Sequence, residues 1–255
     1  MRLFAEDTNP SARAPTRDRL LGGRVVILQP RSGYRAAIDP VLLAAAVAAA
    51  PGESVLDAGC GTGAAALCLA ARSPEVRVVG LERDPEIAAL ARESVALNGW
   101  EGRVRVITGD LLRPPGELRR TGFSWVMSNP PHLEPSRARP PAEGGRRAAR
   151  IESVSLADWI AACLARLLPG GRIVLVHRAD RLADLLAALR GRSGEITVFP
   201  LWPKAEEPAR RVLVRARKGS RAPCRLLPGL VLHRADGTFT EAAEAILREA
   251  EPLAW

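Results

Sequence analysis

The 255-residue chain is poor in several features, and each shortage excludes a class of protein. It has no run of 18 or more apolar residues, so we expect no membrane-spanning helix. Its first residues lack the apolar core of a signal peptide, which predicts a cytoplasmic protein. None of its four cysteines form a CxxC pair, and its three histidines do not complete a zinc pattern. We therefore expect no metal site.

Lysine is almost absent, and arginine takes its place. The chain has 37 basic and 28 acidic residues, a net charge of +9, and its only lysines are Lys204 and Lys218. A guanidinium can donate two parallel hydrogen bonds to a phosphate, so this composition favours a nucleic-acid partner. A GC-rich genome would give the same bias, and composition alone leaves both explanations open.

Apolar residues make up 47% of the chain, enough for a sizeable core. We expect three parts along the sequence. Residues 1–23 are polar and contain prolines, which predicts a flexible arm. Residues 24–218 are expected to form one α/β domain, and residues 219–255 a C-terminal extension packed on it.

Strand and helix patterns alternate along the middle of the chain. Strands are expected at residues 24–29, 54–56, 76–81, 104–108, 123–128, 172–177, 196–199 and 211–217. Helices are expected at residues 39–50, 64–72, 85–98, 155–168, 181–190 and 240–249. Such alternation predicts a mostly parallel sheet with helices on both faces. The last two strands have no helical pattern between them, so we expect a hairpin that adds an antiparallel edge strand.

Three glycines, Gly59, Gly61 and Gly63, stand where the strand at residues 54–56 meets the next helix. Glycines there permit a tight turn and let a ligand lie against bare backbone. The spacing of Gly59, Gly61 and Ala64 also satisfies a dinucleotide-binding fingerprint. Glu82, at the end of the following strand, could hold ribose hydroxyls in either kind of protein. These residues alone leave S-adenosylmethionine and a nicotinamide or flavin dinucleotide both open.

Two acidic residues favour S-adenosylmethionine. Asp57 lies two residues before Gly59, where a carboxylate would attract the ammonium group of a methionine moiety and repel a pyrophosphate. Asp110 follows the third strand of the series and could accept a hydrogen bond from an adenine amino group, although Gly-Asp is also a common turn. The predicted cofactor-binding residues are Asp57, Gly59, Gly61, Gly63, Glu82, Asp110 and Leu111.

The segment Ser128-Asn129-Pro130-Pro131-His132 follows the fourth strand of the series. This segment resembles the (N/D)PP(Y/F) motif of class I amino-methyltransferases, and the resemblance covers roughly residues 24–217. Gly33-Tyr34-Arg35, together with Asp39 and the apolar residues 42–44, is similar to bacterial tRNA (adenine-N6)-methyltransferases of the valine-tRNA type. The resemblance implies a seven-stranded, Rossmann-like class I methyltransferase sheet. It also implies two further residues near the cofactor, Tyr34 and Asp39.

The motif suits a difficult nucleophile, because an exocyclic amino nitrogen shares its lone pair with the ring. The side-chain oxygen of Asn129 and the carbonyl of Pro130 can each accept one N–H, which aims the lone pair at a sulfonium methyl. Pro131 stiffens the loop. His132 stands where the family has Tyr or Phe, and a neutral imidazole stacks on a base less strongly. The predicted catalytic residues are Asn129, Pro130, Pro131 and His132.

The leading hypothesis is methylation of N6 of adenine in tRNA. Residues 135–150 carry five arginines beside the motif; they could contact RNA phosphates or simply be solvated. Protein-glutamine N5-methylation uses the same acceptor logic, but the residues before position 24 leave no room for the helical domain usual in that family. An RNA-binding relative without catalysis, suggested by His132 and the basic segment, and a dinucleotide-dependent oxidoreductase also stay open.

Overall fold

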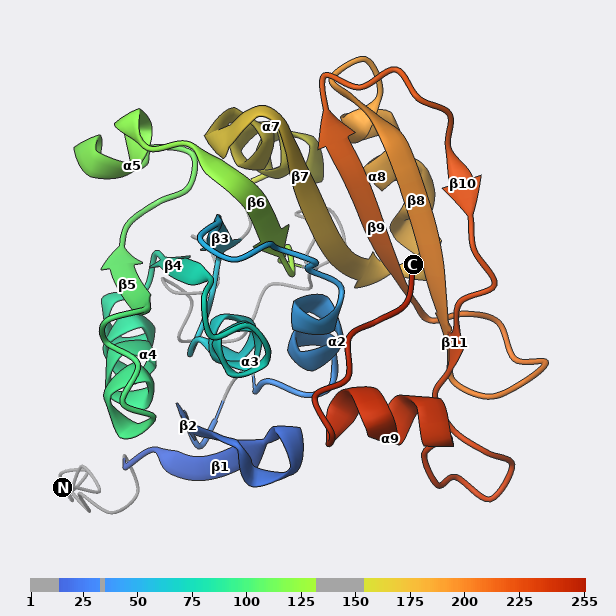
Figure 1. Ribbon diagram of the computed structural model, residues 1–255, viewed down its shortest axis with the longest axis horizontal. Helices are drawn as coiled ribbons and strands as arrows, with labels where there is room; N and C mark the ends of the chain where they lie inside the picture. Colours follow the sequence, from blue (N-terminus) through green and yellow to red (C-terminus); the bar gives the residue numbers. More distant parts are fainter. Residues whose placement is uncertain (1–13, 33–34, 132–153) are drawn as a thin grey trace, which may run out of the picture.

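The computed structural model describes residues 14–32, 35–131 and 154–255, and a large sheet forms its centre (Figure 1). The strands of this sheet are β3 (Ser54–Ala58), β4 (Arg77–Glu82), β5 (Val104–Thr108), β6 (Phe123–Ser128), β7 (Leu167–Arg178), β8 (Ser193–Trp202), β9 (Arg211–Lys218), β10 (Arg225–Leu226) and β11 (Leu230–Val231). Their order across the sheet is β10-β8-β9-β7-β6-β3-β4-β5, with β11 also paired to β8. The seven strands expected from residue 54 onward are all present.

The described helices are α2 (Asp39–Ala45), α3 (Ala64–Arg72), α4 (Pro85–Leu97), α5 (Gly116–Arg120), α7 (Leu156–Arg166), α8 (Leu182–Leu189) and α9 (Glu241–Leu247), with short 3-10 turns η1 (Leu21–Gly23) and η2 (Ala179–Arg181). Helices α3, α4, α5, α7 and α8 lie between strands of this sheet along the chain, whereas α2 precedes β3 and α9 follows β11. The start of α4 shows how the sequence defines a boundary: the Asp84 carboxylate accepts from the Glu86 N–H at 2.9 Å, and Pro85 takes the first helical position. Within the described ranges, no helix is long and apolar enough to cross a membrane.

The sheet has an apolar core on each face, because successive side chains of a buried strand point to opposite sides. In β7, Val174 belongs to a core shared with α2, α3 and α9, whereas Leu175 belongs to a core shared with α7 and α8. Strands β3, β4, β5, β6 and β7 pair in parallel. The expectation of a mostly parallel sheet covered on both faces is therefore confirmed.

The antiparallel strand has a different position from the one we expected. The hairpin of β8 and β9 is present, but β9 pairs antiparallel with both β7 and β8, so it lies inside the sheet and not at its edge. The crossover through α8 carries β8 one strand further out, and β9 returns into the gap beside β7. The edge beyond β8 is made by the short parallel strands β10 and β11.

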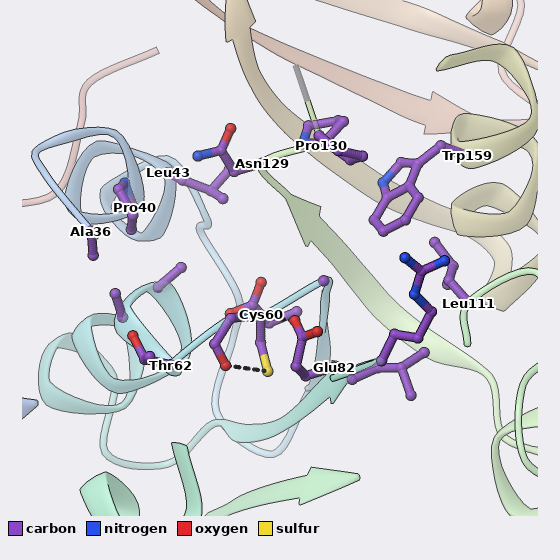
Figure 2. Close-up of a pocket in the computed structure, with 18 of the residues that line it drawn as sticks. Ala36, Pro40, Leu43, Cys60, Thr62, Glu82, Leu111, Asn129, Pro130 and Trp159 are labelled. Atoms are coloured by element: carbon purple, nitrogen blue, oxygen red, sulfur yellow. Dashed lines mark hydrogen bonds between the residues drawn. The ribbon is translucent and has the colours of Figure 1, made fainter. Parts of the chain in front are cut away.

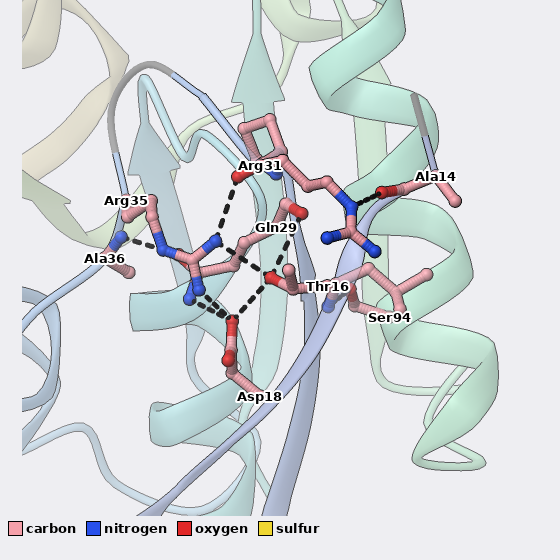
Figure 3. Close-up of polar contacts among 10 residues, drawn as sticks. Ala14, Thr16, Asp18, Gln29, Arg31, Arg35, Ala36 and Ser94 are labelled. Carbon is pink, nitrogen blue, oxygen red and sulfur yellow. Dashed lines mark hydrogen bonds and ion pairs between the residues drawn. The ribbon is translucent and has the colours of Figure 1, made fainter. Parts of the chain in front are cut away.

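A second, two-stranded sheet corrects the expected extent of the N-terminal arm. Residues Thr16–Leu20 form β1, which pairs antiparallel with β2 (Val25–Gln29). Asp18 holds the hairpin to the segment before α2, because its Oδ2 lies 2.6 Å from Arg35 Nη2 and accepts from Gln29 Nε2 at 2.9 Å (Figure 3). The alternation of charged and apolar residues in β1 is that of a half-exposed strand, and these polar partners are what order it.

The C-terminal segment lies against the same domain. Helix α9 contacts α2, and beyond it the Leu253 N–H donates to the Ala45 carbonyl at 2.9 Å. Trp255 Nε1 donates to the Ala46 carbonyl at 2.9 Å, and the Trp255 ring meets the Phe199 ring edge-on. These contacts place the last residues beside the outer strands of the sheet.

Candidate active site

A cavity of about 430 Å³ opens at the carboxyl ends of β3, β4, β5 and β6 (Figure 2). This is the edge of a parallel sheet at which α/β proteins bind ligands. The structure brings most of the predicted site residues together here. Those that line the cavity are Asp57, Gly59, Gly61, Glu82, Asp110, Leu111, Asn129, Pro130 and Pro131.

The glycine turn after β3 depends on residues without side chains. Gly59 and Gly61 have φ values of 73° and 56°, in the left-handed region that glycine adopts without strain. The Gly61 N–H donates to Glu82 Oε2 at 3.0 Å, and Glu82 Oε1 accepts from the Asp84 N–H at 2.8 Å. A Cβ built on Gly61 would meet no described atom within 4 Å. The turn is therefore held from β4, and the space beside it is open to a ligand.

Asp57 is a buried carboxylate at the floor of the cavity, 2% exposed. Its Oδ2 accepts from the Ala66 N–H at 3.1 Å, in the first turn of α3, whose N-cap position is the side-chain-free Gly63. Burial raises the pKa of Asp57 from 3.8 to about 7; the Ala66 N–H opposes this shift, and the charge of Glu82 adds to it. A cationic ligand would favour the ionised form.

The charge of the cavity suits a cation better than a pyrophosphate. Asp57, Glu82 and Asp110 line it, against the single arginine Arg83 among the described residues. Asp110 Oδ1 also accepts from the Leu112 N–H at 2.9 Å, which fixes its orientation. S-adenosylmethionine carries a sulfonium and an ammonium group, so these carboxylates fit it, whereas a dinucleotide phosphate would meet repulsion.

The turn that follows β6 is tied to the glycine turn through an aromatic residue that we did not predict. Trp159, in the first turn of α7, donates from Nε1 to Ser128 Oγ at 3.0 Å, and Ser128 Oγ donates to the Ala58 carbonyl at 2.6 Å. A Cβ on Gly59 would come within 2.9 Å of the Trp159 ring. Figure 2 shows the indole beside Pro130 on the wall of the cavity. The signal that could have identified Trp159 is that a bulky aromatic residue stands at the start of a helix of small apolar residues.

Four predicted residues are not placed in the cavity. Gly63 lies outside the lining and packs near Ala91 of α4. Asp39 also lies outside it; its Oδ2 is 2.9 Å from Arg211 Nε, and its neighbour Pro40 lines the cavity instead. Tyr34 and His132 lie outside the described residues, as does the arginine-rich segment 135–150. The segment expected near the cofactor does reach the cavity, but through Ala36, Pro40 and Leu43, which we did not predict.

Comparisons with known proteins agree with this chemistry. The family model of the methyltransferase small domain matches residues 36–190. A Porphyromonas gingivalis protein named tRNA1(Val) (adenine(37)-N6)-methyltransferase is 33% identical, over 85% of this chain and 88% of that protein. An Aeromonas hydrophila protein of the same name is 30% identical, over 83% of this chain and 87% of that protein.

Solved structures show the same fold. One from Agrobacterium tumefaciens, described as a predicted O-methyltransferase, has a TM-score of 0.71 and 28% identity, and the match covers 85% of this chain and 98% of that one. An S-adenosylmethionine-dependent O-methyltransferase from Thermotoga maritima, at 19% identity and a TM-score of 0.53, covers 75% and 68% and shows the fold alone. These matches decide against the dinucleotide-dependent oxidoreductase. Since the family model spans more than half of the sequence and the cavity suits a sulfonium cofactor, the chain belongs to the methyltransferase small-domain family of S-adenosylmethionine-dependent methyltransferases.

Proposed function

We propose that this enzyme methylates N6 of an adenine in tRNA. One observation carries the proposal: Asn129 and Pro130, the residues suited to accept the two N–H groups of an amino nitrogen, line the same cavity as Asp57 and Glu82. A substrate amino group held at this turn would therefore lie beside the cofactor.

The residues of the turn make the amino nitrogen reactive. The Asn129 side-chain oxygen and the Pro130 carbonyl each accept one N–H, so the lone pair is withdrawn from conjugation and directed into the cavity. S-adenosylmethionine, when bound, supplies an electrophilic methyl group on its sulfonium sulfur. Transfer would form the N–C bond as the S–C bond breaks, and the methylated nitrogen would then release its proton to solvent. No strong general base is required.

The cofactor-facing roles follow from the chemistry of the lining. Asp57 would hold the ammonium group, Glu82 the ribose hydroxyls, and Asp110 with Leu111 the adenine. Gly59 and Gly61 leave bare backbone against the ligand. His132 would stack on the target base, and Tyr34 would pack near the cofactor. Asp39 pairs with Arg211 outside the lining, so it would contribute indirectly, by holding α2 in place.

The substrate class is supported by the relatives, which are named for adenine N6 in tRNA, and by the arginine-based charge of +9. The proposal places the enzyme in the cytoplasm, together with its tRNA.

The test is transfer of a labelled methyl group from S-adenosylmethionine to total cellular RNA, with a protein fraction in parallel. Label in the tRNA-sized fraction, recovered as N6-methyladenosine after digestion, is expected. Label confined to protein would replace the proposal with glutamine methylation. RNA binding without any transfer would point to a relative that has lost catalysis.

A further inference from the structure

Four arginines lie on one face of the large sheet, on its outer strands and away from the cavity. They are Arg172 of β7, Arg215 and Arg217 of β9, and Arg225 of β10. Arg172 stands opposite Arg217, and Thr197 of β8 stands opposite both Arg215 and Arg225. Residues opposite one another on neighbouring strands project from the same face. We call this set the arginine face.

Within the described residues, helices leave open the end of the sheet that carries the arginine face. Helices α7 and α8 pack on the other side of the sheet, where Leu185 and Leu189 meet Val212 and Val214. Helices α2 and α9 pack on the same side as the arginine face, but toward the other end of β8 and β9, where Phe199 and Leu213 join their core (Figure 1). The side chains of Arg172 and Arg217 are 37% and 47% exposed, and Arg225 is exposed. These guanidinium groups are accessible to a large partner.

The positive charge of the arginine face is poorly neutralised. Glu195, in a bulge of β8 with a φ of 51°, lies 3.7 Å from both Arg172 Nη2 and Arg217 Nη1. It is the acid that pairs with this set among the described residues, so four positive charges meet one negative charge. Burial and the charges of Arg172 and Arg225 lower the pKa of the Arg215 guanidinium, with Glu195 opposing them. Such crowding of like charges favours binding of an anion.

An aromatic residue orients the central arginine. The Arg215 guanidinium lies over the Trp255 ring, 4.3 Å from its centroid. A stacked guanidinium keeps the donors at its edge pointing outward, where they can reach phosphate oxygens two at a time. Arg172 lies in the same way over Trp125, at 5.7 Å.

The arginine face lies at the opposite end of β9 from the rim of the cavity. Arg211, six residues before Arg217, shares its side of the strand and pairs with Asp39 at 2.9 Å, next to the cavity-lining Pro40. Six residues of a strand span about 20 Å. Because Leu213, between Arg211 and Arg215 on this side of the strand, is buried in the core, an RNA with one base in the cavity would reach the arginine face by passing around that covered part.

We propose that the arginine face binds the sugar–phosphate backbone of the RNA substrate outside the base pocket. The proposal rests on the proposed function, and it assigns a surface that positions the RNA and does not read its sequence. Guanidinium groups, a net positive charge and an open sheet face fit a polyanion better than an apolar protein partner.

The test compares two double substitutions that each remove two positive charges. R217Q/R225Q alters the arginine face at its exposed positions, and R119Q/R120Q alters exposed arginines on α5, at the far side of the sheet. Binding of purified tRNA is measured at several salt concentrations. Affinity for S-adenosylmethionine and the melting temperature report whether each variant is folded.

We expect R217Q/R225Q to weaken tRNA binding about tenfold near physiological salt, and to reduce the slope of log K against log salt by about 2. R119Q/R120Q should leave both close to wild type, and R217K/R225K should recover most of the affinity because it retains the charge. The loss should shrink with a short oligonucleotide that does not extend from the cavity to the arginine face.

Equal losses in the two double variants would overturn the proposal while leaving RNA methylation intact. The proposal would also be overturned if R217Q/R225Q changed the oligomeric state and left RNA affinity unchanged, because the face would then join copies of this chain. If the wild-type chain binds tRNA through these arginines but transfers no methyl group, the proposed function fails and the assignment of the surface stands.

Discussion

Trp159 donates a hydrogen bond from its indole Nε1 to Ser128 Oγ at 3.0 Å, and Ser128 is the residue immediately before Asn129. Ser128 Oγ in turn donates to the Ala58 carbonyl, next to the glycine turn. A single chain of hydrogen bonds therefore connects α7, the turn of Asn129 and Pro130, and the glycine turn. The distance between the two turns depends on it.

Replacing Trp159 by Phe keeps an aromatic ring against Gly59 but removes the donor. One lost hydrogen bond costs about 1 kcal/mol, and a looser Asn129 turn should lower kcat about tenfold with little change in cofactor affinity. Trp202→Phe is the matched control, because its Nε1 donates to the Pro228 carbonyl far from the cavity. Steady-state kinetics separate the two, and equal kcat in both variants would remove Trp159 from the positioning of the turn.

Asn129→Ala removes the acceptor proposed for one amino N–H. A preorganised polar contact to the reacting group contributes roughly 100- to 1,000-fold to kcat, so a loss of that size is expected. Binding of S-adenosylmethionine, measured by calorimetry, should stay near wild type. Retention of full turnover would contradict the proposed chemistry.

Gly59→Ala tests the close approach of the glycine turn to Trp159. The added Cβ would lie 2.9 Å from the ring, at a φ of 73°, so overpacking should add about 1–3 kcal/mol to the cost of a left-handed alanine. Gly52→Ala, at a φ of 80° with no described atom within 4 Å of its Cβ, has the backbone strain alone. Chemical denaturation should show Gly59→Ala as the less stable variant; the reverse order would mean that the ring moves aside freely.

Asp57→Asn should stabilise the ligand-free protein at high pH. Because the folded-state pKa is raised from 3.8 to about 7, the stability that Asp57 contributes is complete below pH 4 and is lost as the pH rises to about 7. Asparagine lacks this titration, so at pH 8 its advantage over wild type could reach about 4 kcal/mol. Urea denaturation at pH 5 and pH 8 checks it, and a difference independent of pH would contradict it. Cofactor affinity should fall in the same variant.

Local patterns predicted the parts of the molecule that depend on neighbouring residues. Strands β3–β7 follow from their apolar runs, and the turn before α3 follows from its glycines, so both can be read from short stretches of sequence. Asp57, Glu82 and Asn129 stand at the ends of these strands, and the edge of the sheet with the cavity could therefore be located from them. The position of β9 could not be predicted, because the same strand sequence can form an antiparallel edge strand or lie between two neighbouring strands. Trp159 and Arg211 could not be predicted either, because each contacts a residue far away in the sequence. Trp159 contacts Ser128, 31 positions before it, and Arg211 contacts Asp39, 172 positions before it. The hairpin of β1 depends on Arg35, seventeen residues beyond Asp18.

The buried Asp57 has a consequence for cofactor uptake. A carboxyl that titrates near neutrality is partly protonated in the empty enzyme, and a cationic ligand placed beside it expels that proton. Uptake of S-adenosylmethionine should therefore release a fraction of a proton at pH 7, and the observed heat of binding should change with the ionisation enthalpy of the buffer. With Asp57 in the role proposed for it, occupancy of the cofactor site would be linked to the acidity of its surroundings.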